Sequence, residues 1–253
     1  MSRHHKEHSV LIFGLHSVQA LLNHAPERVL QLFVQKERHD QRLQTVESLA
    51  QQHGVALQRV SRERLEQMQS GNVHQGVVAE IRPAAVLGEA DLIRIIESAR
   101  SPLLLVLDGI QDPHNLGACL RTAEAVGVDA VIAPRDKAAG LSATVRKVAS
   151  GAAELLPFVQ VVNLARTLKM VREHGVWVVG AAGETAQSLY ETDLNRPLAL
   201  VLGAEGSGLR RLTAEHCDQL VRIPMVGRVE SLNVSVAAGV LLYETLRQRG
   251  GAC

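Results

Sequence analysis

From Leu103 onward the chain alternates short, uniformly apolar runs with segments that have helical periodicity. A strand that is apolar on both faces must be covered on both faces, which is typical of a parallel sheet with helices on each side. We therefore expect an α/β fold from this half of the chain. The expected strands are 103–107, 128–133, 158–162, 176–181, 198–202 and 221–223, and the expected helices are 116–126, 144–153, 164–174 and 233–249.

Residues 10–81 predict a separate, smaller α/β unit. Its helices are expected over 15–22, 41–53 (ended by Gly54) and 62–69, and its strands over 29–34, 55–60 and 76–81. His74 lies in the polar turn before the last of these strands, and we interpret it as a turn histidine. Residues 82–101 form the expected connector, with a helix over 90–99 between Gly88 and Pro102. The predicted domains are thus 1–81, 82–101 and 102–253.

Composition narrows the functional class. No apolar run approaches 18 residues, so we expect no membrane span, and the first ten residues lack the apolar stretch of a signal peptide. Cys119, Cys217 and Cys253 are far apart, which predicts a reduced, cytoplasmic protein without disulfides or a metal site. The net charge of +1 neither requires nor excludes a nucleic-acid partner. With only 2% aromatic residues, an RNA-binding chain of this kind should read phosphate, ribose and shape more than stacked bases.

Three loops concentrate polar side chains and glycines directly after predicted strands. They lie within 108–121, 200–209 and 223–236, and they contain Asn115, Arg121, Glu205 and Asn233. Loops at the carboxyl ends of parallel strands are where open α/β sheets build ligand sites. One composite site is therefore the leading hypothesis.

In the first loop, Asn115 is expected to be a helix N-cap. Arg121 is flanked one turn away by Gly117 and Ala125, which leaves room for a ligand to approach. A surface ion pair between Arg121 and Glu124 is the alternative. Because of the loop that precedes it, we favour an anion or phosphate contact for this arginine.

The second and third loops suggest a ligand held by backbone. Gly203, Gly206 and Gly208 surround Glu205. No Gly-Lys-Ser/Thr follows, which disfavours triphosphate binding, and the glycine spacing is not GxGxxG, which disfavours dinucleotide binding and hence a dinucleotide oxidoreductase. In the third loop, Ser231 and Asn233 flank one apolar residue, so one is expected to cap the last helix and the other to face a ligand. That helix is apolar nearly all round over 234–243, which predicts burial against the domain or another subunit.

These loops carry the motifs N-L-G-A-C-L-R (115–121), L-G-A-E-G-S-G-L (202–209), I-P-M (223–225) and S-L-N-V-S-V-A (231–237). In them the whole chain resembles the SpoU class of RNA ribose 2′-O-methyltransferases of the SPOUT superfamily. The resemblance implies S-adenosyl-L-methionine as methyl donor and a C-terminal trefoil knot within the α/β fold. It also implies a substrate-binding, L30e-like N-terminal domain and a homodimer formed through the knotted region. The implied substrate is the ribose 2′-hydroxyl of a guanosine in 23S ribosomal RNA, in the peptidyl-transferase region.

The resemblance also assigns residues. Backbone around Gly203, Ile223 and Leu232 should cradle the adenosine of the donor, with Met225 and Ser231 alongside. Asn115, Arg121, Glu205 and Asn233 match the catalytic positions of the family. Arginine almost never loses its proton, so we expect Arg121 to hold a phosphate and stabilise the developing alkoxide, with the asparagines orienting groups and Glu205 fixing Arg121 or the ribose. A methyltransferase acting on tRNA or on another rRNA site, including an antibiotic-resistance enzyme, and a non-catalytic RNA-binding assembly factor remain alternatives.

Overall fold

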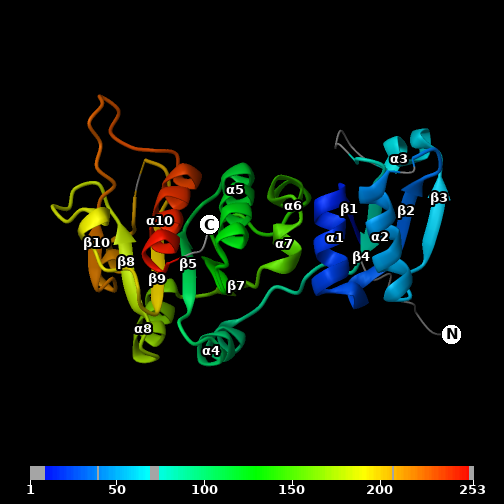
Figure 1. The fold of residues 1–253 in the computed structure, drawn as a ribbon. Helices are drawn as coiled ribbons and strands as arrows, with labels where there is room; N and C mark the ends of the chain where they lie inside the picture. Colours follow the sequence, from blue (N-terminus) through cyan, green and yellow to red (C-terminus); the bar gives the residue numbers. More distant parts are fainter. Residues whose placement is uncertain (1–8, 39, 69–73, 207, 251–253) are drawn as a thin grey trace. The chain divides into compact units, whose positions relative to one another are not determined.

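The computed structural model describes residues 9–38, 40–68, 74–206 and 208–250, which form two compact units (Figure 1). The first unit contains the residues up to Ala85 together with Ser150–Leu155. The second contains Val86–Ala149 and the residues from Leu156 onward. The division differs from the expected boundaries, since the expected connector is split, with residues 82–85 in the first unit and 86–101 in the second, and a short later segment belongs to the first.

The first unit is a four-stranded mixed sheet in the order β1-β4-β2-β3, with helices on both faces. β4 pairs antiparallel with β1 and β2, and β2 pairs parallel with β3. Apolar side chains of α1 and α2 form the main core with one face, and Leu65 of α3 packs with Val60 and Val78 on the other. The elements are β1 (Val10–Phe13), α1 (Leu15–His24), a 3-10 turn (Pro26–Arg28), β2 (Val29–Gln35), α2 (Gln41–Gln52), β3 (Leu57–Val60), α3 (Arg62–Met68) and β4 (Val77–Ile81).

Every element predicted for this unit is present, with ends that move by up to two residues. The end of the helix predicted to Gln69 lies outside the described residues. The strand β1 is missing from the prediction, because four residues give too short a pattern to distinguish from an extended terminus. His74 is buried in the turn before β4, and its Nδ1 accepts the Gly76 N–H at 2.9 Å. The interpretation of His74 as a turn histidine is confirmed.

The segment Ser150–Leu155, which includes α7 (Ala152–Leu155), packs with the first unit although it lies between two strands of the second in sequence. Arg28 forms an ion pair with the buried Glu154 carboxylate and also donates from Nη1 to the Glu154 carbonyl at 2.5 Å. The same carboxylate accepts the Ala84 N–H at 2.7 Å. Ser17 Oγ donates to the Ser150 carbonyl at 2.6 Å. The segment is therefore bonded to α1, to the residue before β2 and to the residues that follow β4.

The second unit is a six-stranded sheet in the order β10-β8-β9-β5-β6-β7, and all its neighbouring strands are parallel. The parallel sheet expected from the apolar runs is confirmed. The elements are α4 (Glu89–Ser98), β5 (Leu103–Asp108), α5 (Pro113–Val126), β6 (Ala130–Pro134), α6 (Ala143–Ala149), β7 (Phe158–Val161), α8 (Leu164–Glu173), β8 (Trp177–Ala181), a 3-10 turn (Leu189–Glu191), β9 (Leu198–Gly203), α9 (Arg211–Glu215), β10 (Gln219–Val221) and α10 (Val234–Gln248).

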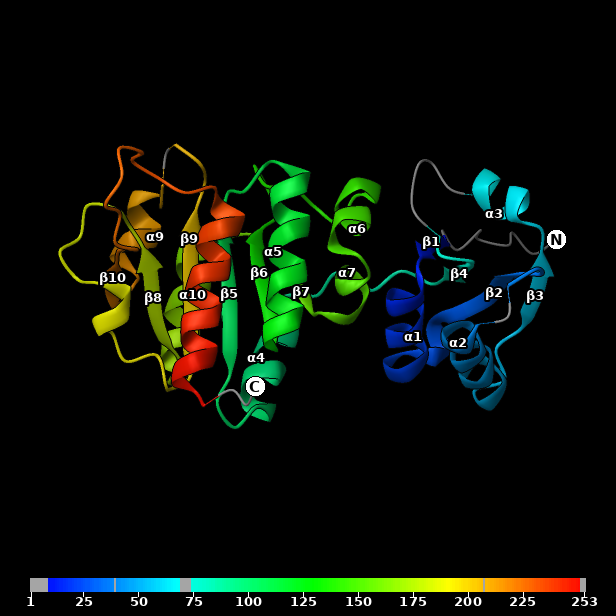
Figure 2. The same ribbon diagram turned by 45° about the horizontal axis from the view of Figure 1, so that its top comes forward.

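Helices cover both faces of this sheet. α5 and α10 lie side by side on one face (Figure 2). On the other face, Leu92 and Ile96 of α4 and Leu168 of α8 pack on strand side chains such as Val106. The expected connector helix is therefore part of the core of this unit. The trefoil knot implied by the family resemblance stays a prediction.

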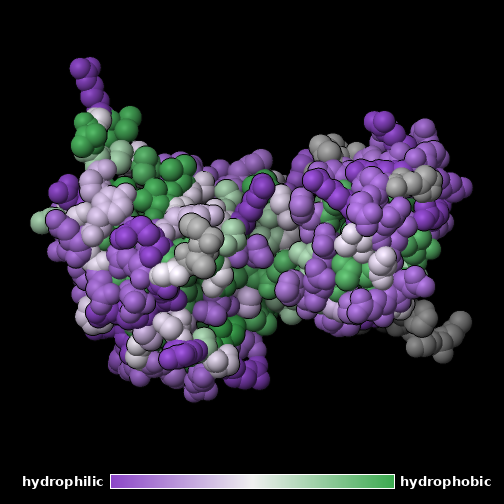
Figure 3. All heavy atoms as spheres, in the orientation of Figure 1, coloured by the Kyte–Doolittle hydropathy of each residue, from purple (hydrophilic) through white to green (hydrophobic). Residues whose placement is uncertain are grey.

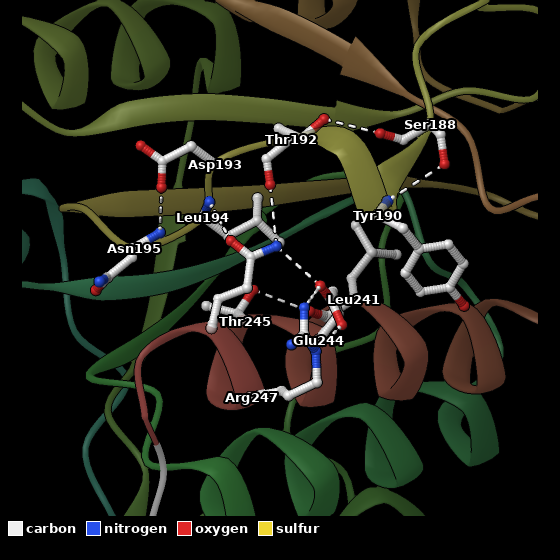
Figure 4. Close-up of polar contacts among 11 residues, drawn as sticks. Ser188, Tyr190, Thr192, Asp193, Leu194, Asn195, Leu241, Glu244, Thr245 and Arg247 are labelled. Atoms are coloured by element: carbon white, nitrogen blue, oxygen red, sulfur yellow. Dashed lines mark hydrogen bonds and ion pairs between the residues drawn. The ribbon is translucent and has the colours of Figure 1, made fainter.

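Near its C-terminal end, α10 is fastened to the segment that precedes β9 (Figure 4). Gln248 Oε1 accepts the Leu194 N–H at 2.8 Å, and its Nε2 donates to the Thr192 carbonyl at 3.0 Å. The same Nε2 donates to Glu244 at 2.8 Å, and two hydrogen bonds from Arg247 lower the pKa of that buried carboxylate. These bonds fix the helix whose other end enters the candidate site.

Four details of this unit differ from the prediction. The single helix expected over 144–153 is broken at Ser150 and Gly151, which have φ of 52° and 95°, and a Cβ at Gly151 would lie 2.8 Å from the Ser17 Cβ. The last strand is Gln219–Val221 instead of 221–223, and the short helix α9 is missing from the prediction. The fourth is the N-cap expected at Asn115, since Asp112 caps α5 instead.

Candidate active site

The three polar loops meet at the carboxyl edge of the parallel sheet. β5 and β9 are adjacent, and their last residues, Asp108 and Gly203, are partners in register. α5 follows β5, the loop with Glu205 follows β9, and α10 packs against α5. This arrangement brings side chains separated by about half the chain into hydrogen-bonding distance.

Asn115 is not the N-cap of α5. Asp112 caps the helix, because its side chain accepts the His114 N–H at 2.9 Å, and Pro113 occupies the first turn. The sequence signal was present, since proline is favoured at the first helical position directly after a capping residue. Asn115 is therefore a buried residue within the first turn, and its amide is available for contacts with the other loops.

Glu205 joins the other two loops. Its Oε1 accepts from Asn115 Nδ2 at 3.2 Å and from Asn233 Nδ2 at 2.5 Å. The backbone N–H of Val234, at the start of α10, is 3.4 Å from the same oxygen. The carboxylate thus lies at a helix N-terminus, where backbone N–H groups favour negative charge.

Asn233, and not Ser231, is the residue that caps α10, and its amide also reaches the other two loops. Its Oδ1 caps α10 by accepting the Ser235 N–H at 3.0 Å, and its Nδ2 donates to Glu205 and, at 2.9 Å, to Asn115 Oδ1. Ser231 is exposed and lies before the helix. Three of the four expected catalytic residues, Asn115, Glu205 and Asn233, therefore form one hydrogen-bonded cluster.

Arg121 lies outside that cluster. It is exposed on α5, and within the described part of the chain it makes no hydrogen bond or ion pair, so the alternative pair with Glu124 is not formed. Glu205 contacts the two asparagines and not this arginine. The space expected beside Gly117 is filled by α6, since a Cβ there would lie 2.6 Å from the Val148 Cβ.

The residues expected to hold a donor lie around the same edge of the sheet. Ile223, Met225 and Leu232 are half-buried in the loop between β10 and α10, and their backbone groups make no hydrogen bond with any described residue. Gly203 ends β9 and has no room for a side chain, because a Cβ would lie 2.0 Å from the Gly208 carbonyl group. Free backbone donors and acceptors beside half-buried apolar side chains suit the edge and faces of an adenine.

Other chemistries find less support in the described residues. Burial raises the pKa of the Cys119 and Cys217 thiols to about 12, so neither is a thiolate nucleophile near neutral pH. Among these residues no group of His, Cys, Asp or Glu side chains is arranged to hold a metal ion, and no helix is long and apolar enough to cross a membrane.

Sequence reasoning also missed Asp108 and its partner. Asp108 is buried at the end of β5, and its Oδ2 accepts the Arg210 N–H at 3.1 Å. The available signal was a single acidic residue at the end of a run of five apolar ones, since a buried charge needs a partner.

Solved structures place this fold among RNA methyltransferases. A crystal structure of an RNA 2′-O ribose methyltransferase is 28% identical, covers 98% of this chain and 92% of its own, and has a TM-score of 0.74. The SpoU methyltransferase AviRb from Streptomyces viridochromogenes, in complex with AdoMet, shares the fold, with 24% identity, coverage of 96% of this chain and 92% of its own, and a TM-score of 0.75. The fold and the loop cluster thus define an α/β RNA methyltransferase.

Sequence comparison gives the family. Residues 102–243 match the SpoU rRNA Methylase family, and residues 11–87 match the RNA 2′-O ribose methyltransferase substrate-binding domain. The 23S rRNA (guanosine-2′-O-)-methyltransferase RlmB of Pasteurella multocida is 56% identical over 94% of this chain and 98% of its own. The protein of that name from Escherichia coli K12 is 52% identical over 95% of this chain and 99% of its own. The chain belongs to the SpoU rRNA methylase family.

Proposed function

We propose that this protein transfers a methyl group from S-adenosyl-L-methionine to the ribose 2′-hydroxyl of a guanosine in 23S ribosomal RNA, acting in the cytoplasm. The observation that carries the proposal is the cluster of Asn115, Glu205 and Asn233, built from three loops of a chain that is 52% identical to the E. coli RlmB over nearly its whole length. The expected position of the guanosine in the peptidyl-transferase region stays a prediction.

The cluster is suited to orienting a ribose. A 2′-hydroxyl is a weak nucleophile, and its oxygen must be aligned with the methyl group before transfer. The Glu205 carboxylate, held by two amides, is a fixed acceptor for a hydroxyl proton. Asn115 retains further hydrogen-bonding capacity, because the cluster uses one of its two N–H donors and one of the two lone pairs of its oxygen. Asn233 uses both donors and both lone pairs, so it holds the cluster together.

Arg121 has a different role in this proposal. Its guanidinium is exposed and unpaired among the described residues, so it is free to bind a phosphate of the RNA. A cation beside the reacting ribose also stabilises the charge that develops on the oxygen. The arginine need not lose its proton for either task.

For the donor, we propose that backbone around Gly203, Ile223 and Leu232 holds the adenosine, with Met225 and Ser231 alongside. When bound, S-adenosyl-L-methionine would supply an electrophilic methyl group, whose bond to the sulfonium sulfur breaks as the bond to the ribose oxygen forms, leaving S-adenosylhomocysteine. The residues of the chain position the two reactants and exclude competing water. They contribute no covalent intermediate.

We propose that the first unit binds the RNA substrate. Its charges include several exposed arginines, and it contains none of the three site loops. Removing this unit should therefore affect the choice of RNA substrate more than the binding of the donor.

We also propose a homodimer. Val236 and Tyr243 lie on one side of α10, seven residues apart, with 51% and 55% of their surfaces exposed. Val226 and Val229, in the loop before that helix, are exposed as well, and Figure 3 shows hydrophobic surface over this loop. An exposed apolar surface of this kind favours self-association. Sedimentation equilibrium of the protein and of Tyr243→Glu tests it, and a monomeric parent protein would contradict it.

The central test of function is a map of 2′-O-methyl groups in 23S rRNA from cells with and without the gene. We expect one guanosine to lose its methyl group in the deletion strain. Expression of the parent protein should restore it, and expression of Glu205→Gln should not. An unchanged map in the deletion strain would contradict the proposed function.

A further inference from the structure

Asp108 is a buried charged residue outside the cluster of Asn115, Glu205 and Asn233. It is the last residue of β5, and its side chain has no exposed surface. Its Oδ2 accepts the backbone N–H of Arg210 at 3.1 Å, and its Oδ1 lies 3.5 Å from Arg210 Nε. Within the described residues, Oδ1 accepts no hydrogen bond. The carboxylate is thus directed at one residue, through both the backbone and the side chain.

Arg210 is held in place from a second side by Gly109. Gly109 has a φ of 79°, and a Cβ built on it would lie 2.9 Å from Arg210 Nη2. The guanidinium therefore lies against the backbone that directly follows Asp108. Any larger residue at position 109 would displace it.

The contact with Asp108 closes the loop that carries Glu205. The Gly208 N–H donates to the Ala204 carbonyl at 2.9 Å, so the chain turns back on itself between these residues. At the base of this turn, Asp108 fixes Arg210 beside the end of β9. Glu205 lies between these closing contacts, and its carboxylate reaches Asn115 and Asn233.

A purely stabilising role does not require a charge at position 108. Burial of a carboxylate carries a desolvation penalty, and a half-exposed arginine at 3.5 Å offsets it incompletely. A well-packed apolar pair would serve stability at least as well. A charged acceptor does, however, fix both the backbone and the side chain of Arg210 in one geometry.

We propose that Asp108 is a positioning residue for methyl transfer, which acts through Arg210 to fix the loop that places the Glu205 carboxylate. The inference rests on the proposed function, because it assumes that Glu205 takes part in the reaction. Asp108 itself need not touch the substrate or the donor.

The experiment is a mutant cycle measured by single-turnover methylation of 23S rRNA by the full chain. Asp108→Asn is made in the parent protein and in Glu205→Gln. In the parent, we expect the rate to fall by about tenfold or more, because small displacements of a positioned group have effects of this size. In the Glu205→Gln background, the same substitution should change the rate by less than about twofold, since the group it positions is already absent. Arg211→Ala is the control, because this exposed neighbour pairs with Glu215, and its rate should equal that of the parent.

Thermal unfolding of each variant shows whether a lower rate reflects lost positioning or a loss of the folded state. If Asp108→Asn does not fold, Arg210→Ala replaces it in the cycle, since this change removes the guanidinium from an exposed site and keeps the backbone N–H. Equal losses of rate in both backgrounds, or no loss in the parent, would overturn the positioning role alone. An undiminished rate in Glu205→Gln by itself would overturn the proposed site and, with it, the positioning role.

Discussion

Gly117 of α5 faces Val148 of α6 at a separation that excludes any side chain, since a Cβ on Gly117 would lie 2.6 Å from the Val148 Cβ and 2.9 Å from the Val145 carbonyl oxygen. We expect Gly117→Ala to lower the free energy of unfolding by about 1–3 kcal/mol, the usual effect of overpacking a core contact. Thermal or denaturant unfolding measures this change.

The matched control is Gly239→Ala in α10, where a Cβ would meet only Thr122, at 4.0 Å. Because alanine is the better helix former, this variant should be unchanged or more stable by about 0.5–1 kcal/mol. A Gly117→Ala variant as stable as the parent protein would contradict the close packing of α5 against α6.

Asn233→Asp separates the two tasks of Asn233. Aspartate is as good an N-cap as asparagine, so the stability of α10 should be kept, but a carboxylate would replace the amide that donates to Glu205. We expect methyl transfer to slow by about a hundredfold, comparable to the loss of one oriented donor. Single-turnover rates and melting temperatures test this prediction. Asn233→Ala, which loses both tasks, should be less stable by about 1 kcal/mol as well.

Arg121→Ala should slow transfer by about a hundredfold or more, about 2.7 kcal/mol, if this residue acts on developing charge. Donor affinity and melting temperature should change little, because the side chain is exposed and has no partner among the described residues. Arg121→Lys should also be slow, since an ammonium does not reproduce the planar fork. A near-normal rate in single-turnover assays of Arg121→Ala would leave this residue without a catalytic role.

His74 makes the stability of the first unit sensitive to pH. Burial lowers its pKa from the ordinary value of 6.5, and its neutral Nδ1 accepts the Gly76 N–H. The unfolded chain therefore takes up this proton at a higher pH than the folded one. The stabilisation that the neutral His74 provides is complete above about pH 6.5. It is lost as the pH falls through the lower pKa that His74 has in the folded protein. Melting temperatures between about pH 8 and about pH 5 should fall less in His74→Gln than in the parent, and parallel curves would contradict this.

A fragment of residues 86–253 should bind S-adenosyl-L-methionine, and it should not methylate 23S rRNA, because it lacks the proposed substrate-binding unit. A fragment that starts at residue 100 should be less stable, since it also loses the buried Leu92 and Ile96 of α4. Calorimetric titration and thermal unfolding of both fragments give the comparison. Full rRNA methylation by residues 86–253 would show that the catalytic unit selects its substrate alone.

The parallel sheet was predictable because its strands are apolar on both faces, as in Leu103–Asp108. The meeting of three loops was predictable from their positions after such strands. The cap of α5 could also have been found, since Asp112 followed by Pro113 is a strong signal for the start of a helix.

Other features depend on contacts that a local pattern does not contain. The break at Ser150 and Gly151 follows from the packing of this turn against Ser17, far away in sequence. Likewise, the dual role of Asn233 depends on Glu205 and Asn115 being in reach of one amide. The family resemblance named the candidate site residues, whereas their hydrogen bonds depend on the folded arrangement of the three loops.

The attachment of Ser150–Leu155 to the first unit has a consequence for the design of hybrid enzymes. A substrate-binding unit transplanted from a relative by cutting the chain near Ala85 would arrive without the six residues that complete it. Its arginine equivalent to Arg28 would then face the host's own segment. A working exchange should therefore transfer two pieces of sequence, the N-terminal unit and the short stretch between α6 and β7. The transplanted arginine would then keep the glutamate with which it pairs in its own protein, as Arg28 pairs with Glu154 here.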